Sequence, residues 1–122
     1  MASKISDKSV RELVFNKYGG KCSYCGCLLS HPFHIDHLIP KRRYSYVCNP
    51  ALEKGKDIVE NFMPSCISCN TSKSDLSIEQ FRERVFDRLR RLNNSSTEYR
   101  IAKRFGLVTE NITPIVFHFE KV

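Results

Sequence analysis

Two pairs of cysteines, each pair separated by two residues, constrain the fold of this chain more than any other feature. Cys22 and Cys25 form the first pair, and Cys66 and Cys69 form the second. Four thiolates at this spacing bind Zn²⁺ tetrahedrally and leave no open position on the ion, so we expect a structural four-cysteine zinc site. The alternative is two pairs of unrelated free cysteines. A disulfide framework is not expected, because the first residues are polar and do not form an apolar signal segment.

Two further cysteines, Cys27 and Cys48, fall outside this spacing. We expect both to be ordinary buried thiols, and the alternative is that one of them replaces a ligand of the zinc site.

The length and the charge narrow the class of protein. A chain of 122 residues indicates one domain, and a bound metal would help so small a core. The net charge of +7 and the pI near 9.2 attract polyanions, most often nucleic acid and less often a membrane surface. No apolar run approaches the roughly 18 residues of a membrane-spanning helix. We therefore expect a cytoplasmic protein that does not associate with membranes.

Hydrophobic periodicity and turn signals predict an α+β chain. Capping boxes, Ser9 with Glu12 and Ser77 with Gln80, are expected to start the first and the longest helix. The predicted helices cover residues 6–18, a stretch with Ser65 as its N-cap, residues 77–92 and residues 97–105. The predicted strands cover residues 32–39, 58–63 and 115–119, with His118 on the exposed face of the last strand.

The stretch between the two cysteine pairs carries groups suited to phosphodiester cleavage. This reaction needs a base that deprotonates water and a cation that stabilises charge on the phosphate. Asp36 and Asn70 offer the oxygen ligands that Mg²⁺ prefers, and His37 is a base whose ordinary pKa lies near neutral pH. A regular strand would send Asp36 and His37 to opposite faces, so the backbone must turn there if both serve one site.

These residues resemble the HNH endonuclease family. The resemblance covers about residues 15–75 and rests on His34 to Pro40, on Asn61 and on Cys66 to Lys73. The Cys22–Cys25 pair is similar to that of the zinc-bearing members. The resemblance implies a ββα-metal (His-Me finger) core with flanking helices, in one domain over residues 1–122. It says little about the extension from about residue 77 to 122.

The resemblance also implies a role for each matching residue. Asp36 and Asn70 would bind a catalytic Mg²⁺ or Mn²⁺ ion, although many relatives have His at the position of Asn70. His37 would be the general base, and Asn61 would brace the loop and the base. His34 would lie near the scissile phosphate or only pack at the start of the strand. Lys73 would contact phosphate or be a solvated helix residue.

A basic run, Lys41-Arg42-Arg43, follows the predicted catalytic strand. It would bind phosphates of the nucleic acid or be a solvated run of charge.

The predicted function is that of a metal-dependent endonuclease that hydrolyses DNA, encoded by a bacterium or a phage. The first alternative is a zinc-stabilised nucleic-acid-binding module without catalysis, which leaves Asp36, His37 and Asn70 unexplained. The second is a nuclease subunit that is active only with a partner protein. Cleavage of both strands would need a homodimer or two encounters.

Overall fold

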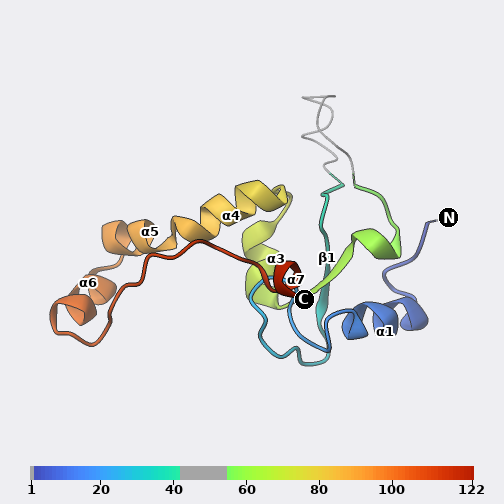
Figure 1. Ribbon diagram of the computed structural model, residues 1–122, viewed down its shortest axis with the longest axis horizontal. Helices are drawn as coiled ribbons and strands as arrows, with labels where there is room; N and C mark the ends of the chain where they lie inside the picture. The colour runs from blue at the N-terminus through green and yellow to red at the C-terminus, as the bar shows by residue number, and fades with distance from the viewer. Residues whose placement is uncertain (1, 42–54) are drawn as a thin grey trace.

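The computed structural model describes residues 2–41 and 55–122. Along the chain, helix α1 precedes a pair of short strands, and five helices follow (Figure 1). The elements are α1 (Lys8–Asn16), β1 (His34–His37), the 3-10 helix η1 (Val59–Asn61), β2 (Phe62–Ser65), α3 (Ile67–Lys73), α4 (Ile78–Phe86), α5 (Arg88–Ser95), α6 (Thr97–Arg104) and α7 (His118–Lys121).

Helix α1 is shorter than predicted and begins at a different cap. Asp7 is its N-cap, and the Oδ1 atom of Asp7 accepts hydrogen bonds from the backbone N–H groups of Ser9 and Val10. The predicted capping box of Ser9 and Glu12 is therefore wrong. An Asp carboxylate satisfies two free N–H groups at once and is also favoured by the helix dipole.

Strands β1 and β2 form a two-stranded antiparallel sheet. His34 pairs with Ser65 at one end and His37 pairs with Phe62 at the other. The second strand was predicted over residues 58–63, but residues Val59–Asn61 form the 3-10 helix and the strand begins only at Phe62. All four residues of β2 are buried, whereas β1 is buried mainly at Asp36.

Helix α3 packs against β1 and carries the second cysteine pair at its beginning. Its N-cap is Cys66 and not the predicted Ser65, and the Cys66 sulfur accepts a hydrogen bond from the Cys69 backbone N–H at 3.4 Å. Ser65 is instead the last residue of β2. A cysteine used as a cap holds both members of the pair in one tight turn, with their sulfurs close together.

The helices from α4 to α6 extend away from the sheet, and the chain after α6 runs back toward it (Figure 1). The capping box of Ser77 and Gln80 is present at the start of α4. The long helix predicted to reach Leu92 is interrupted at Asp87, whose ψ of −2° departs from helical geometry. Helix α6 ends close to its predicted limit, followed by Gly106 with φ +73°.

The strand predicted over residues 115–119 is wrong. Ile115 and Phe117 do pack against the core, as their alternation indicated, but His118 begins the short helix α7. The backbone N–H groups of His118 and Phe119 donate to the carbonyl oxygens of Tyr24 and Ser23. The end of the chain therefore binds the loop of the first cysteine pair, and His118 is half-buried there.

Two small hydrophobic clusters form the core. The first contains Tyr24 and the ring of Phe117, which stacks on Phe81 with centroids 5.2 Å apart. The ring of Tyr24 meets both of these rings edge-on, a favourable aromatic arrangement. The second cluster contains Val14, Phe33 and Phe62. The two clusters join the N-terminal helix, the sheet and the C-terminal segment.

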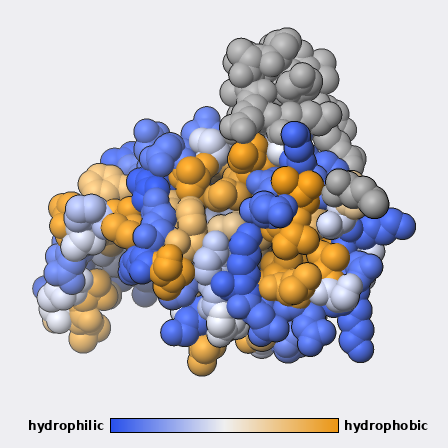
Figure 2. Space-filling model, turned by 45° about the vertical axis from the view of Figure 1, so that its right-hand side comes forward, coloured by the Kyte–Doolittle hydropathy of each residue, from blue (hydrophilic) through white to orange (hydrophobic). Residues whose placement is uncertain are grey.

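Apolar residues also reach the surface in several patches with hydrophilic residues between them (Figure 2). Many of the exposed large apolar residues belong to the part of the chain from α4 onward, including Phe86, Ile101, Phe105, Leu107 and Ile112. Within the described ranges, every helix is too short or too polar to cross a membrane.

Candidate functional site

The four paired cysteines converge on one point. The sulfur atoms of Cys22, Cys25, Cys66 and Cys69 all lie within 4.8 Å of one another. The sulfurs of Cys25 and Cys66 are 3.9 Å apart. Four sulfurs around a tetrahedral Zn²⁺ ion, with Zn–S bonds of about 2.3 Å, would be separated by about 3.8 Å. The donor set and its spacing therefore fit zinc, and a four-sulfur site has no open coordination position.

The environment of Cys22 favours its thiolate, the form that binds a metal. The Cys69 thiol and nearby backbone N–H groups donate hydrogen bonds to Cys22 and lower its pKa, and the same hydrogen bond raises the pKa of Cys69. Cys27 lies near this cluster but is exposed, so the prediction that it is buried is wrong. Cys48 lies outside the described residues.

Asp36 is the buried carboxylate of β1. Its Oδ2 atom accepts a hydrogen bond of 2.5 Å from the Tyr24 hydroxyl and lies 2.9 Å from the Nζ atom of Lys73. The Lys73 ammonium also donates to the backbone carbonyl of His37 at 2.8 Å. No described residue donates a hydrogen bond to Oδ1, the second oxygen of this buried carboxylate. Tyr24 was not predicted as part of the site, although its place between the two cysteines of the first pair marks it for a defined position.

Lys73 was predicted to contact phosphate, but its ammonium binds groups inside the protein. Its side chain is 0% exposed, and its charge is matched by the carboxylate of Asp36. A fully buried ammonium needs such a partner, because desolvation without one is costly. In this arrangement Lys73 fixes Asp36 against α3 and does not reach the surface.

His37, the last residue of β1, pairs with a carboxylate that was not predicted from the sequence. Its Nε2 atom forms a hydrogen bond of 2.7 Å with Oδ1 of Asp57, and Lys41 forms a 2.7 Å ion pair with Oδ2 of Asp57. The hydrogen bonds from Lys41, and then from His37, lower the pKa of Asp57. Asp57 lies in a stretch without periodicity.

Asn61 connects the end of β1 to the loop that carries Asp57. Its Oδ1 atom accepts from the backbone N–H of Ile39 at 2.8 Å, and its Nδ2 group donates to the carbonyls of Ile39 and Lys56 at 3.0 and 3.1 Å. Asn61 is buried, so these contacts satisfy a side chain that cannot reach water.

Asp36 and His37 have different partners because they lie on opposite faces of β1. Asp36 contacts Tyr24 and Lys73, and His37 contacts Asp57 and the ring of Phe62. The strand remains regular through His37, and the chain bends only after it. The turn that a shared site would require between Asp36 and His37 is therefore absent, and the two groups lie on opposite faces at the end of one strand.

The other predicted site residues have less defined surroundings. Asn70 is half-buried in α3, on the turn that precedes Lys73. His34 is exposed at the start of β1. Lys41 lies at the edge of the site, where it forms its ion pair with Asp57. Arg42 and Arg43 lie outside the described residues.

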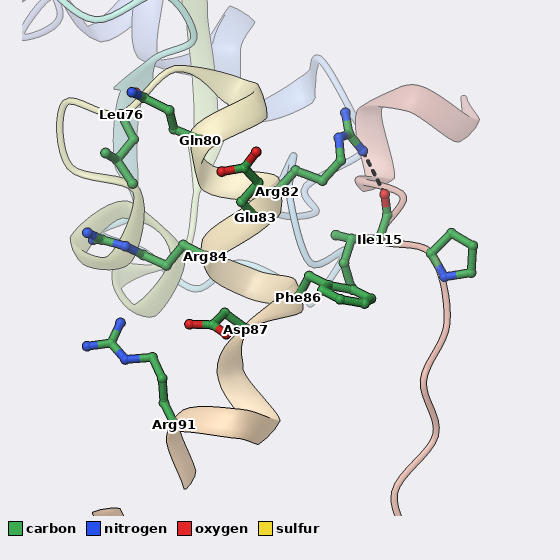
Figure 3. Close-up of a pocket in the computed structure, with 10 residues that line it drawn as sticks. Leu76, Gln80, Arg82, Glu83, Arg84, Phe86, Asp87, Arg91 and Ile115 are labelled. Carbon is green, nitrogen blue, oxygen red and sulfur yellow. Dashed lines mark hydrogen bonds between the residues drawn. The ribbon is translucent and has the colours of Figure 1, made fainter. Parts of the chain in front are cut away.

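A separate hollow lies beside α4, and none of the predicted site residues lines it (Figure 3). Arg82 crosses to the C-terminal segment, where it donates to the Ile115 carbonyl at 2.6 Å and pairs with Glu120 at the same distance. Charges of both signs line the hollow, with Arg84 and Arg91 near Glu83 and Asp87. This mixture does not favour an anionic ligand.

Comparison with known proteins gives a family for the central part of the chain. The HNH endonuclease family model matches residues 22–76, which include both cysteine pairs and all of β1, β2 and α3. No curated protein and no solved structure matches the chain. The resemblance found in the sequence is confirmed over residues 22–76, the segment that matches the HNH endonuclease family model.

Proposed function

We propose that this protein is a divalent-metal-dependent endonuclease that hydrolyses phosphodiester bonds of DNA. The observation that carries the proposal is the end of β1, where a carboxylate and an imidazole follow one another on opposite faces and each is held by its own set of hydrogen bonds. The proposal requires the cleaved phosphate to lie across this end of the strand, within reach of both groups. Both residues lie within the segment that matches the HNH family. The net charge of +7 supports a polyanionic substrate.

Asp36 and Asn70 are the residues proposed to hold the catalytic ion, Mg²⁺ or Mn²⁺. Both supply oxygen donors, which suit a hard cation that keeps several water ligands. Tyr24 and Lys73 engage only Oδ2 of Asp36 and thereby fix the direction of the carboxylate. When bound, such an ion supplies positive charge that stabilises the phosphate and the departing oxygen in the transition state.

His37 is the proposed general base. A neutral imidazole accepts a proton from water as the water oxygen attacks phosphorus in line with the departing 3′ oxygen. The ββα-metal core would present this base at the end of β1, and the four-cysteine zinc site would hold α3 and the first cysteine loop around it. Lys41, with Arg42 and Arg43, is proposed to contact phosphates beside the cleaved bond. Asn61 is proposed to brace the loop, and His34 to lie near the phosphate.

The test is cleavage of supercoiled plasmid by zinc-loaded protein, with and without added Mg²⁺ or Mn²⁺. We expect cleavage only with the added ion. The Asn70→Ala variant should need a higher ion concentration for half-maximal rate, whereas Asn16→Ala, which alters an exposed asparagine of α1, should not. Equal cleavage with and without added ion would contradict the proposal.

A zinc-stabilised DNA-binding module is the second candidate function. It is favoured by the burial of Asp36 and by its pairing with the fully buried Lys73, an arrangement that would serve a structural carboxylate equally well. Ion-independent DNA binding without cleavage of any substrate would favour the module. Cleavage that appears only after addition of a partner protein, or only at concentrations that form a homodimer, would instead identify an incomplete nuclease.

A further inference from the structure

We infer that Asp57 is a positioning residue for the proposed base, because it holds the Nε2–H group of His37 and leaves Nδ1 as the atom that accepts the proton. The inference rests on the proposed nuclease function. It adds Asp57, which is not among the motif residues on which the family resemblance rests. Asp57 does not touch the substrate in this account. It acts only through the imidazole of His37.

Both oxygens of the Asp57 carboxylate are engaged. Oδ1 lies 2.7 Å from Nε2 of His37, and Oδ2 lies 2.7 Å from Nζ of Lys41. The Lys41 contact keeps Asp57 ionised, and an ionised carboxylate can only accept hydrogen bonds. The ring nitrogen that faces Asp57 must therefore carry the hydrogen. In a neutral imidazole the other nitrogen, Nδ1, then has the free lone pair.

The orientation of the His37 ring is also limited by its other neighbours. The ring of Phe62 on β2 meets it edge-on, with centroids 5.4 Å apart and planes at 86°. The Lys73 ammonium binds the His37 backbone carbonyl from α3. No described residue hydrogen-bonds Nδ1, and the side chain keeps 17% of its surface exposed. Water can therefore reach part of the ring, and the inference is that it reaches Nδ1.

The loop that carries Asp57 is held in a fixed position beside β1. The Gly55 N–H donates to the Pro40 carbonyl, and Asn61 binds Lys56, the neighbour of Asp57. The Asp57 carbonyl accepts from the Ser3 N–H at 2.6 Å. A Cβ atom on Gly55 would lie 1.7 Å from the Ile39 carbonyl oxygen, so this close approach requires glycine.

An ionised carboxylate at this position can only accept a hydrogen bond from His37, whereas a neutral amide can also donate one. In Asp57→Asn, the amide N–H₂ group can donate to Nε2 and favour the tautomer that carries its hydrogen on Nδ1. That tautomer has no lone pair on the nitrogen that faces water. In the Ser-His-Asp triad, the same substitution of the orienting carboxylate lowers kcat by about 10⁴-fold with the geometry intact.

The experiment measures the tautomer of His37 by ¹⁵N NMR of the zinc-loaded protein at a pH at which the imidazole is neutral. We expect the Nε2–H tautomer in the wild type and a shift toward Nδ1–H in Asp57→Asn. Glu98→Gln is the matched control, because it removes one negative charge from the exposed surface of α6 and should leave the tautomer unchanged. An Nδ1–H tautomer in the wild type would overturn the inference without any variant.

Kinetics separate the inference from the proposed function. With plasmid DNA and Mn²⁺, Asp57→Asn should lower kcat by about 10²-fold, within the usual contribution of a general base, and leave KM nearly unchanged. Wild-type cleavage that depends on His37 but is unaffected by Asp57→Asn would overturn the role of Asp57 alone. Absence of cleavage by the wild type with either ion would overturn the proposed function and this inference with it.

Discussion

The ammonium of Lys73 lies 2.9 Å from the carboxylate of Asp36, and the lysine side chain is completely buried. This pair joins α3 to β1, and therefore joins the second cysteine pair to the strand that carries the proposed catalytic residues. The stabilities of the fold and of the site are coupled through this contact.

Replacement of Lys73 should destabilise the protein strongly. Lys73→Met keeps most of the side-chain volume but leaves Asp36 buried without its cation, and loss of one member of a buried pair costs about 3–5 kcal/mol. Urea unfolding should show this loss in the free energy of unfolding. Lys21→Met is the control, because Lys21 is exposed, and it should change the free energy by less than about 0.5 kcal/mol. Equal unfolding midpoints for both variants would contradict the assigned role of Lys73.

Tyr24 should stabilise the carboxylate of Asp36 through its hydroxyl. Tyr24→Phe removes a hydrogen bond to a charged group, and we expect a loss of about 1.5–3 kcal/mol in the free energy of unfolding. Tyr18→Phe removes the same atom from a half-buried ring that has no hydrogen-bonded hydroxyl partner among the described residues. A loss as large in Tyr18→Phe as in Tyr24→Phe would show that the Asp36 contact is not the cause.

Removal of zinc should unfold the domain, because the four sulfurs connect the first cysteine loop to α3. Chelation should abolish most of the helical circular dichroism signal, and added Zn²⁺ should restore it. Cys69→Ser should lower the zinc content and the stability, whereas Cys27→Ser, at an exposed thiol outside the four-sulfur group, should change neither. An unchanged spectrum in the fully chelated protein would contradict a structural role for the metal.

Glu110 should hold the segment after α6 against α5 and α6. Asn93, Tyr99 and Lys103 all bind its carboxylate, and these contacts lower its pKa to about 2. The folded-state pKa lies below the ordinary value of 4.5, so the stabilisation is complete above pH 4.5 and is lost as the pH falls through about 2. At pH 7, Glu110→Gln should speed amide hydrogen exchange in α6 and leave exchange in β1 unchanged. Equal exchange rates in α6 of both proteins would refute this role.

The sequence predicted the central part of the fold because its signals there are local and chemical. Two cysteine pairs around a His-Asp-His stretch led to the observed order of β1, β2 and α3 and to the cysteine cluster. The capping box at Ser77 correctly marked the start of α4. These features depend on spacing, which a sequence contains directly.

The errors arose where tertiary contacts decide the structure. Ile115 and Phe117 alternate as in a strand, yet the described segment binds the first cysteine loop and pairs with no strand. The pairing of Lys73 with Asp36 and of His37 with Asp57 joins residues 37 and 20 positions apart, and charge alone does not predict such partners. Asp57 carries no periodic signal, so its position beside the base becomes visible only in three dimensions.

The most direct test of the account is the single-turnover rate of cleavage of an end-labelled DNA duplex with Mn²⁺, measured for the wild type, His37→Ala and His31→Ala. His31 is exposed and has no part in the proposed chemistry, so its variant should cleave at close to the wild-type rate. His37→Ala removes the base and should lower the cleavage rate by about 10²–10⁴-fold without loss of DNA binding. Equal rates for the wild type and His37→Ala would contradict the central claim that His37 activates the attacking water.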